Sequence, residues 1–141
     1  MTNSSRISEV FAGHQFGAPA SVDLVRDCES RLGHPIPAPV RQLYLAFDGF
    51  RGPTDSRFFY SLEELLEVNV FLRSGEFPAF LEKWLAVGDP GTGSYWIVPI
   101  EGRFEVREWD AEWGEDVEVL VGDLVDVWAA KKQLYDSFDE A

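Results

Sequence analysis

Hydrophobic side chains recur at helical spacing in the first half of the chain, over residues 22–32, 40–47 and 62–72. The first of these stretches follows Ser21, whose hydroxyl group can cap a helix. Its apolar face consists of Leu24, Val25, Cys28 and Leu32. Ser61 precedes the third stretch, and Glu64 stands three residues later, which is the spacing of a capping box. The pattern therefore predicts three helices and places the thiol of Cys28 inside the core.

Glycine and proline separate the first two predicted helices. Gly33 follows the last apolar residue of the first helix, where a left-handed residue ends a helix at low cost, and Pro35 cannot continue it. Pro39 suits the first turn of the next helix, because the N–H that proline lacks has no intrahelical partner there. Asp48 and Gly49 end that second helix. We therefore expect two helices that meet at a corner.

Strand patterns dominate the second half of the chain, where the hydrophobic period changes from helical to alternating. The predicted strands cover residues 58–60, 85–88, 94–100, 104–110 and 117–121. Turn residues such as Glu101 and Gly102 separate neighbouring strands closely enough for antiparallel hairpins. Asp123 then caps a last helix over residues 124–138. The predicted buried stripe of that helix is Val127, Trp128, Leu134, Tyr135 and Phe138.

Taken together, these elements predict an α+β fold with a mostly antiparallel sheet of about five strands, covered by N-terminal, middle and C-terminal helices. A chain of 141 residues can bury a core without a metal ion or a disulfide. We expect a single domain over residues 21–141. Residues 1–20 are expected to be loosely ordered, apart from a helical turn in which Ile7, Val10 and Phe11 dock on the core.

The charge of the chain limits its partners. It has 25 acidic and 12 basic residues, a formal net charge of −13 and an isoelectric point near 4.4. This charge repels nucleic acid and anionic membranes and attracts a basic protein, although acidity that serves solubility alone explains the same balance. One cysteine cannot form an internal disulfide, and the N-terminal residues lack the apolar run of a signal peptide or membrane span. We expect a cytoplasmic protein with no nucleic-acid or membrane partner.

The motifs that resemble catalytic or ligand sites fit structural roles better. Residues 88–93 are rich in glycine, but no lysine or helix follows them as a phosphate loop requires, so that a hairpin turn is predicted. The acidic segment 110–116 lacks the residue order of a calcium-binding loop. His14 stands without further metal ligands, and Cys28 without a paired base. We expect no enzymatic activity, no cofactor and no bound metal.

Short motifs around the predicted corner carry a family resemblance, namely Val25, Cys28-Glu29, Leu32-Gly33, Ile36-Pro37, Leu43 and Asp48-Gly49. Together with the order of the elements from about Val22 to Phe138, they resemble the SUKH superfamily. The resemblance implies an α+β domain with a mostly antiparallel sheet covered by helices. It also implies one of two functions, an immunity protein that neutralises a bacterial toxin or a scaffold module of the cell-wall-regulator type.

The charge favours the immunity function, because nuclease toxins tend to be basic and an acidic inhibitor can occupy a groove that binds phosphates. The predicted partner-binding residues lie in the strand region and are Glu105, Glu108, Trp109, Asp110, Glu112, Trp113, Glu115, Asp116 and Glu118. Trp109 and Trp113 are expected to be exposed aromatic anchors among these charges. The alternative is that both tryptophans fold back under the loop and that the charges only solvate an edge strand.

Overall fold

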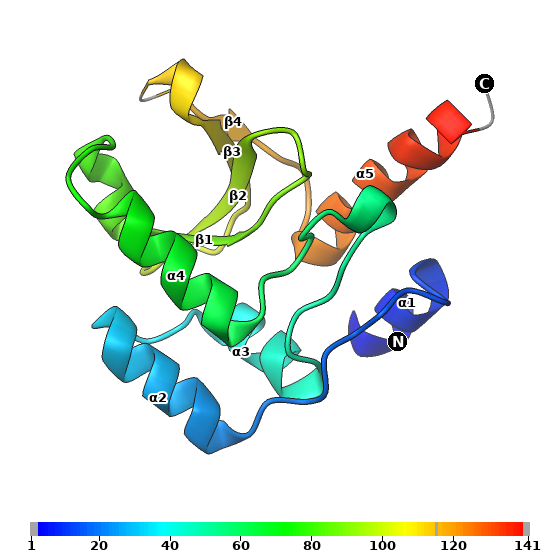
Figure 1. Ribbon diagram of the computed structural model, residues 1–141, viewed down its shortest axis with the longest axis horizontal. Helices are drawn as coiled ribbons and strands as arrows, with labels where there is room; N and C mark the ends of the chain where they lie inside the picture. The colour runs from blue at the N-terminus through cyan, green and yellow to red at the C-terminus, as the bar shows by residue number, and fades with distance from the viewer. Residues whose placement is uncertain (1–2, 115, 140–141) are drawn as a thin grey trace.

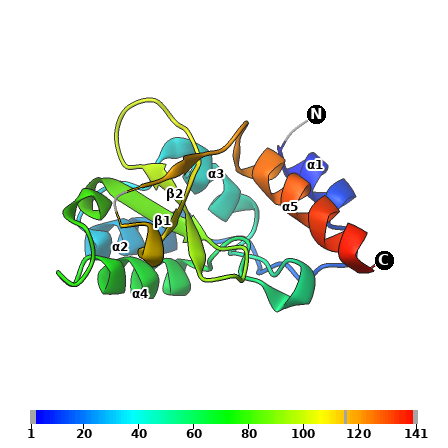
Figure 2. The same ribbon diagram turned by 90° about the horizontal axis from the view of Figure 1, so that it is seen from above.

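The computed structural model describes residues 3–114 and 116–139, and it has the predicted α+β architecture. The helices in this part of the chain are α1 (Asn3–Val10), α2 (Val22–Leu32), α3 (Ala38–Ala46), α4 (Leu62–Leu72) and α5 (Leu124–Asp139). Short 3₁₀ turns lie at η1 (Pro53–Asp55), η2 (Ala79–Lys83) and η3 (Ala111–Trp113). The strands are β1 (Trp84–Gly88), β2 (Ser94–Pro99), β3 (Arg107–Asp110) and β4 (Glu118–Val119). Figures 1 and 2 show α2 and α4 side by side next to the sheet, and α1 beside α5 at the other end of the molecule.

The strands form one antiparallel sheet in the order β1-β2-β3-β4, so the described residues contain one strand fewer than the five expected. The aromatic segment 58–60 is not a strand of the sheet, because its backbone pairing amounts to an isolated bridge between Phe59 and Phe50 and a single bond from Tyr60 N to Val87 O. Its three residues connect a loop directly to the N-cap of α4, which leaves no length for a ladder. The predicted strands 104–110 and 117–121 are also shorter than expected, because only β3 and β4 pair within them.

The helix ends follow the capping chemistry that the sequence predicts. Ser21 accepts a hydrogen bond of 3.1 Å from a backbone N–H of the first turn of α2, and Gly33 ends that helix with φ of 86°. Ser61 and Glu64 form the predicted capping box, with bonds of 3.2 and 3.0 Å. Asp123 accepts a bond of 3.0 Å from the first turn of α5. Each predicted cap is therefore confirmed.

Three residues that the helical pattern predicts to be buried are exposed instead, namely Leu24, Leu134 and Phe138. Leu24 is 56% exposed because α2 packs through Val25 and Cys28, and Leu24 lies beside that face. Leu134 and Phe138 belong to the C-terminal half of α5, which extends past the core in Figure 1. Helical spacing identifies the apolar stripe, but it does not reveal where the packing neighbours end.

Aromatic side chains from distant parts of the chain meet in the core. Trp128 of α5 is fully buried, as predicted, with its ring centroid 4.9 Å from that of Phe50 and 5.3 Å from that of Phe59. Phe11, which follows α1, is also fully buried and lies 4.9 Å from Phe50. These aromatic contacts, of which those of Phe50 with Trp128 and Phe11 are edge-to-face, hold α5 firmly against the N-terminal half of the molecule. This packing positions one wall of the groove described below.

The outer edge of β1 is hydrogen-bonded although no strand of the sheet covers it. Asn69 of α4 is 1% exposed, and its amide donates to Ala86 O and accepts from Ala86 N, both at 2.9 Å. One residue further along, Val87 O accepts a bond of 2.9 Å from Tyr60 N. A buried side-chain amide and a short extended segment thus take the place of a neighbouring strand.

Candidate partner-binding site

The side chains of β2 alternate between the two sides of the sheet. Tyr95 lies on the side of α4, where its ring stacks on Trp109 at 6.0 Å. Trp96 lies on the opposite side, which faces α5, and its ring is 5.1 Å from that of Phe58. Glu108 is the register partner of Trp96 on β3 and therefore shares the side that faces α5.

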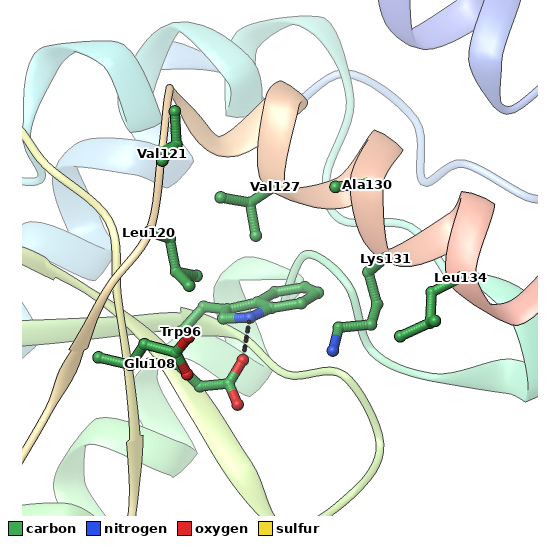
Figure 3. Close-up of a pocket in the computed structure, with 9 residues that line it drawn as sticks. Trp96, Glu108, Leu120, Val121, Val127, Ala130, Lys131 and Leu134 are labelled. Carbon is green, nitrogen blue, oxygen red and sulfur yellow. Dashed lines mark hydrogen bonds between the residues drawn. The ribbon is translucent and has the colours of Figure 1, made fainter.

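A groove of about 320 Å³ lies between this side of the sheet and α5. Its lining residues are Trp96, Glu108, Glu118, Leu120, Val121, Val127, Ala130, Lys131 and Leu134. In Figure 3 the indole of Trp96 lies between the side chains of α5 and those that follow β4. The groove thus has mostly apolar walls, with two carboxylates and one ammonium group among its lining residues.

Two carboxylates oppose each other across the β3–β4 ladder beside this groove. Glu108 and Glu118 are register partners, an arrangement of like charges that destabilises a sheet. Glu108 accepts a hydrogen bond of 3.1 Å from the indole N–H of Trp96, drawn as a dashed line in Figure 3. Burial and, after it, the negative charge of Glu108 raise the pKa of Tyr135 on α5. Among the residues that the structure describes, neither the two carboxylates nor the ammonium group of Lys131 takes part in a salt bridge.

Trp109 is completely buried, and the expectation that it is exposed is wrong. Its side chain packs near Phe77 and Phe80, at 6.1 and 6.2 Å between ring centroids, and its N–H donates to Gly114 O at 2.7 Å. The period of two along β3 puts Trp109 on the opposite side from Glu108, under the segment that follows α4. The alternative, that the tryptophan side chains fold back into the protein, is therefore correct for Trp109. Trp113 in η3, by contrast, is 39% exposed.

The remaining predicted residues are dispersed around the edge of the sheet. Glu105 is half-buried and pairs with Arg107 at 2.6 Å. Asp110 is also half-buried, and it accepts a hydrogen bond of 2.9 Å from the Glu112 N–H at the start of η3. The exposed members are Glu112, Trp113, Asp116 and Glu118, and Glu115 lies outside the described residues. Of the eight predicted residues that the structure describes, only Glu108 and Glu118 line the groove beside α5.

The α5 wall of the groove was missed by sequence reasoning. Val127, Ala130, Lys131 and Leu134 all line it. Their spacing of three, four and seven residues places them on one face of a helix, which is a signal that the sequence contains. The sequence pattern assigned Val127 and Leu134 to the core, because periodicity alone does not distinguish a stripe that packs on a core from one that borders a groove.

The structure gives little support for a cysteine nucleophile, a metal site or a membrane-spanning helix among the described residues. Cys28 is buried, as predicted, and burial raises the pKa of its thiol to about 11, which disfavours the nucleophilic thiolate. Within residues 3–114 and 116–139, no group of three or more His, Cys, Asp or Glu side chains is placed to hold a metal ion. No helix in the same part of the chain is long and apolar enough to cross a membrane.

Comparison with known families gives one match. The model of the SMI1/KNR4 family (SUKH-1) matches residues 19–141, which include every strand and the helices from α2 to α5. No curated protein matches the chain at a significant level. The matched range contains the corner between α2 and α3 as well as both sides of the groove.

Proposed function

Because the chain belongs to the SMI1/KNR4 family (SUKH-1), we propose that it is an immunity protein that binds and neutralises a basic toxin domain of the nuclease type. The SUKH superfamily includes toxin immunity proteins and cell-wall regulators. The observation that carries the proposal is the groove beside α5, where Glu108 and Glu118 oppose each other and neither forms a salt bridge with a described residue. In this proposal the protein acts in the bacterial cytoplasm by protein–protein contact, without catalysis, cofactor or metal.

Two features support a basic protein as the partner. The net charge of −13 attracts a basic domain from a distance and raises the rate of association. At close range the groove combines apolar walls with carboxylates, and Val121 at its rim is 93% exposed. An apolar centre with a charged rim is the usual composition of a protein interface. The exposed residues Glu112, Trp113 and Asp116 extend the proposed surface along the sheet edge.

A second candidate function is a scaffold module of the cell-wall-regulator type without a toxin partner. Apolar residues are also exposed far from the groove, on α2 and α3, where Val22 is 51%, Leu24 56% and Leu45 40% exposed. Val22 and Leu45 border a second cavity of about 170 Å³. Several separate apolar surfaces suit a protein that joins more than one partner.

Co-expression with the toxin domain encoded beside the gene tests the proposal. We expect the intact protein to protect cells from that domain and to bind it in a 1:1 complex whose association slows as salt is added. A matched pair of variants locates the surface: Glu118→Lys is expected to weaken the complex more than Asp27→Lys, which changes an exposed carboxylate on α2. Absence of both protection and binding at low salt would contradict the immunity function and favour the scaffold function.

A further inference from the structure

The groove beside α5 has the form of a slot for a long side chain. Leu120, Val127 and Leu134 supply apolar surface from both of its walls. The carboxylate of Glu108 and the indole N–H to which it is bonded lie at its sheet side, as Figure 3 shows. Its volume of about 320 Å³ lies at the lower end of the range for small-molecule pockets, so one or two side chains of a partner fill it.

The charges in the groove define which side chain fits. Glu108 and Glu118 place two negative charges opposite each other, and Lys131 places one positive charge on the other wall. One negative charge is therefore left uncompensated among the lining residues. Like charges at directly opposed positions weaken a sheet, and proteins retain such costs where function requires them.

We propose that this groove receives an arginine side chain of the protein partner. The methylene stem lies along the apolar walls, and the guanidinium group pairs with the carboxylates of Glu108 and Glu118. Arginine suits the site better than lysine, because its planar fork donates to two carboxylates at once and its weaker hydration lowers the cost of burial. This inference rests on the proposed function, since it names the group that the binding surface recognises on a basic partner.

The change in binding when the charge of Lys131 is removed distinguishes arginine from other classes of ligand. Its ammonium group competes with an incoming cation for the same carboxylates, so removing its charge strengthens the binding of arginine. An anionic ligand would respond in the opposite direction, because it would lose its only cation among the lining residues. A purely apolar ligand would respond to neither the carboxylates nor the ammonium group.

The experiment is an NMR titration of the intact protein with the tripeptide N-acetyl-Gly-Arg-Gly amide. The matched control peptide carries citrulline, a neutral isostere, in place of arginine. The indole N–H of Trp96 is the reporter, since it donates to Glu108. We expect the arginine peptide to shift this signal with a dissociation constant on the order of millimolar, as befits a single side chain. The citrulline peptide is expected to leave the signal in place over the same range.

Four variants then assign the effect to the groove. The double variant Glu108→Gln/Glu118→Gln removes both charges and keeps an acceptor for the indole, and we expect it to weaken arginine binding by about tenfold or more. Glu67→Gln makes the same type of change at an exposed position of α4, away from the lining residues, and is expected to change binding by less than about twofold. Lys131→Met is expected to strengthen binding by about threefold. Phe71→Ala, which alters an exposed aromatic residue of α4 outside the groove, is expected to leave the Trp96 shift unchanged.

Several results would overturn the inference. They are the absence of a Trp96 shift with the arginine peptide, an equal shift with citrulline, and weaker binding by Lys131→Met. The same variants separate this inference from the proposed function when they are tested against the toxin domain. Undiminished toxin binding by Glu108→Gln/Glu118→Gln would contradict the arginine slot and leave the immunity function standing. Binding of the arginine peptide without any toxin binding would contradict the immunity function alone.

Discussion

The two outer edges of the sheet differ in what covers them. At β1, Asn69 and Tyr60 bond to backbone groups that no strand reaches, and α4 packs alongside. At β4, no described segment pairs with the outer side, and Val119 is 60% exposed. Both edges belong to one antiparallel sheet, but β1 is apolar throughout and almost entirely buried, whereas β4 consists of the exposed pair Glu118 and Val119. The edge that becomes core therefore combines an apolar strand with cover from a helix and a side-chain amide, whereas the edge that becomes surface has neither.

This difference separates stability from binding within a single sheet. The closed edge near β1 carries buried hydrogen bonds and apolar contacts, which are expensive to disturb. The open edge near β4 carries the carboxylates and the exposed Val121 that border the groove, where substitutions change stability little.

Trp109 is an exception to this contrast between the two edges, because it is fully buried although it lies on β3, next to the open edge. We expect Trp109→Ala to lower the free energy of unfolding by about 3–5 kcal/mol, because it leaves a large cavity and an unpaired Gly114 carbonyl. Trp113→Ala is the matched control and is expected to cost less than about 1 kcal/mol. Urea denaturation of both variants measures this. Equal midpoints would show that Trp109 does not belong to the core.

Breaking the closed edge at Asn69 is expected to have the next largest effect. Asn69→Ala removes the partner of both Ala86 N and Ala86 O, and we expect it to cost about 2–3 kcal/mol because buried backbone groups are left unsatisfied. Glu67→Ala, at an exposed position of the same helix, should change stability by less than about 0.5 kcal/mol. The amide of Ala86 should also exchange hydrogen faster in the Asn69 variant. Slow exchange and unchanged stability together would mean that a neighbouring protein group, rather than Asn69, closes this edge.

The titration of the Cys28 thiol reports whether water is excluded from the inner face of α2, which packs beside α4. Burial raises the pKa of its thiol from 9.0 to about 11, so the folded state favours the neutral form. Above pH 9 the unfolded chain loses this proton first, and stability is therefore lost as the pH rises from 9 to about 11. Cys28→Ala lacks this contribution, and comparing the two pH profiles isolates it from the buried tyrosines. Rapid alkylation of the native thiol at neutral pH would contradict the burial of this face.

At the open edge, neutralising Glu118 is expected to change stability by the smallest amount. Glu118→Gln removes the repulsion between Glu118 and Glu108, and we expect it to raise the free energy of unfolding by about 0.2–1 kcal/mol. Added salt should reduce the gain, because Glu118 is exposed and its charge is screened. Glu112→Gln lacks an opposed carboxylate in the ladder and serves as the control. A loss of stability in the Glu118 variant would mean that its charge has a stabilising partner.

Parts of the fold were predictable because their causes are local. The caps at Ser21, Ser61 and Asp123 form bonds within the next turn of the chain, so the sequence alone contains both partners. The same holds for the stop at Gly33, where the αL conformation favours glycine. Element order, the antiparallel pairing and the α+β class followed from these signals together with the change of period.

The candidate site was only partly predictable. The sequence pointed to Glu108 and Glu118, which line the groove, but it offered Trp109 as an exposed anchor, and Trp109 is buried. Alternation along β3 already requires Trp109 and Glu108 to face opposite sides of the sheet. Which side is covered depends on the segment around Phe77 and Phe80, about thirty residues earlier in the chain, and nothing local to β3 reports that contact.

The order of the main helices and strands, the caps of α2, α4 and α5, and the acidic net charge followed from the sequence alone. Tertiary structure alone decided that Asn69 closes the β1 edge, that α5 stands off the sheet at a groove, and that Glu108 meets Glu118. The physical reason is the range of the interactions. Caps and periodicity act over one or two turns, whereas burial and opposed charges depend on surfaces that meet only after the chain has folded.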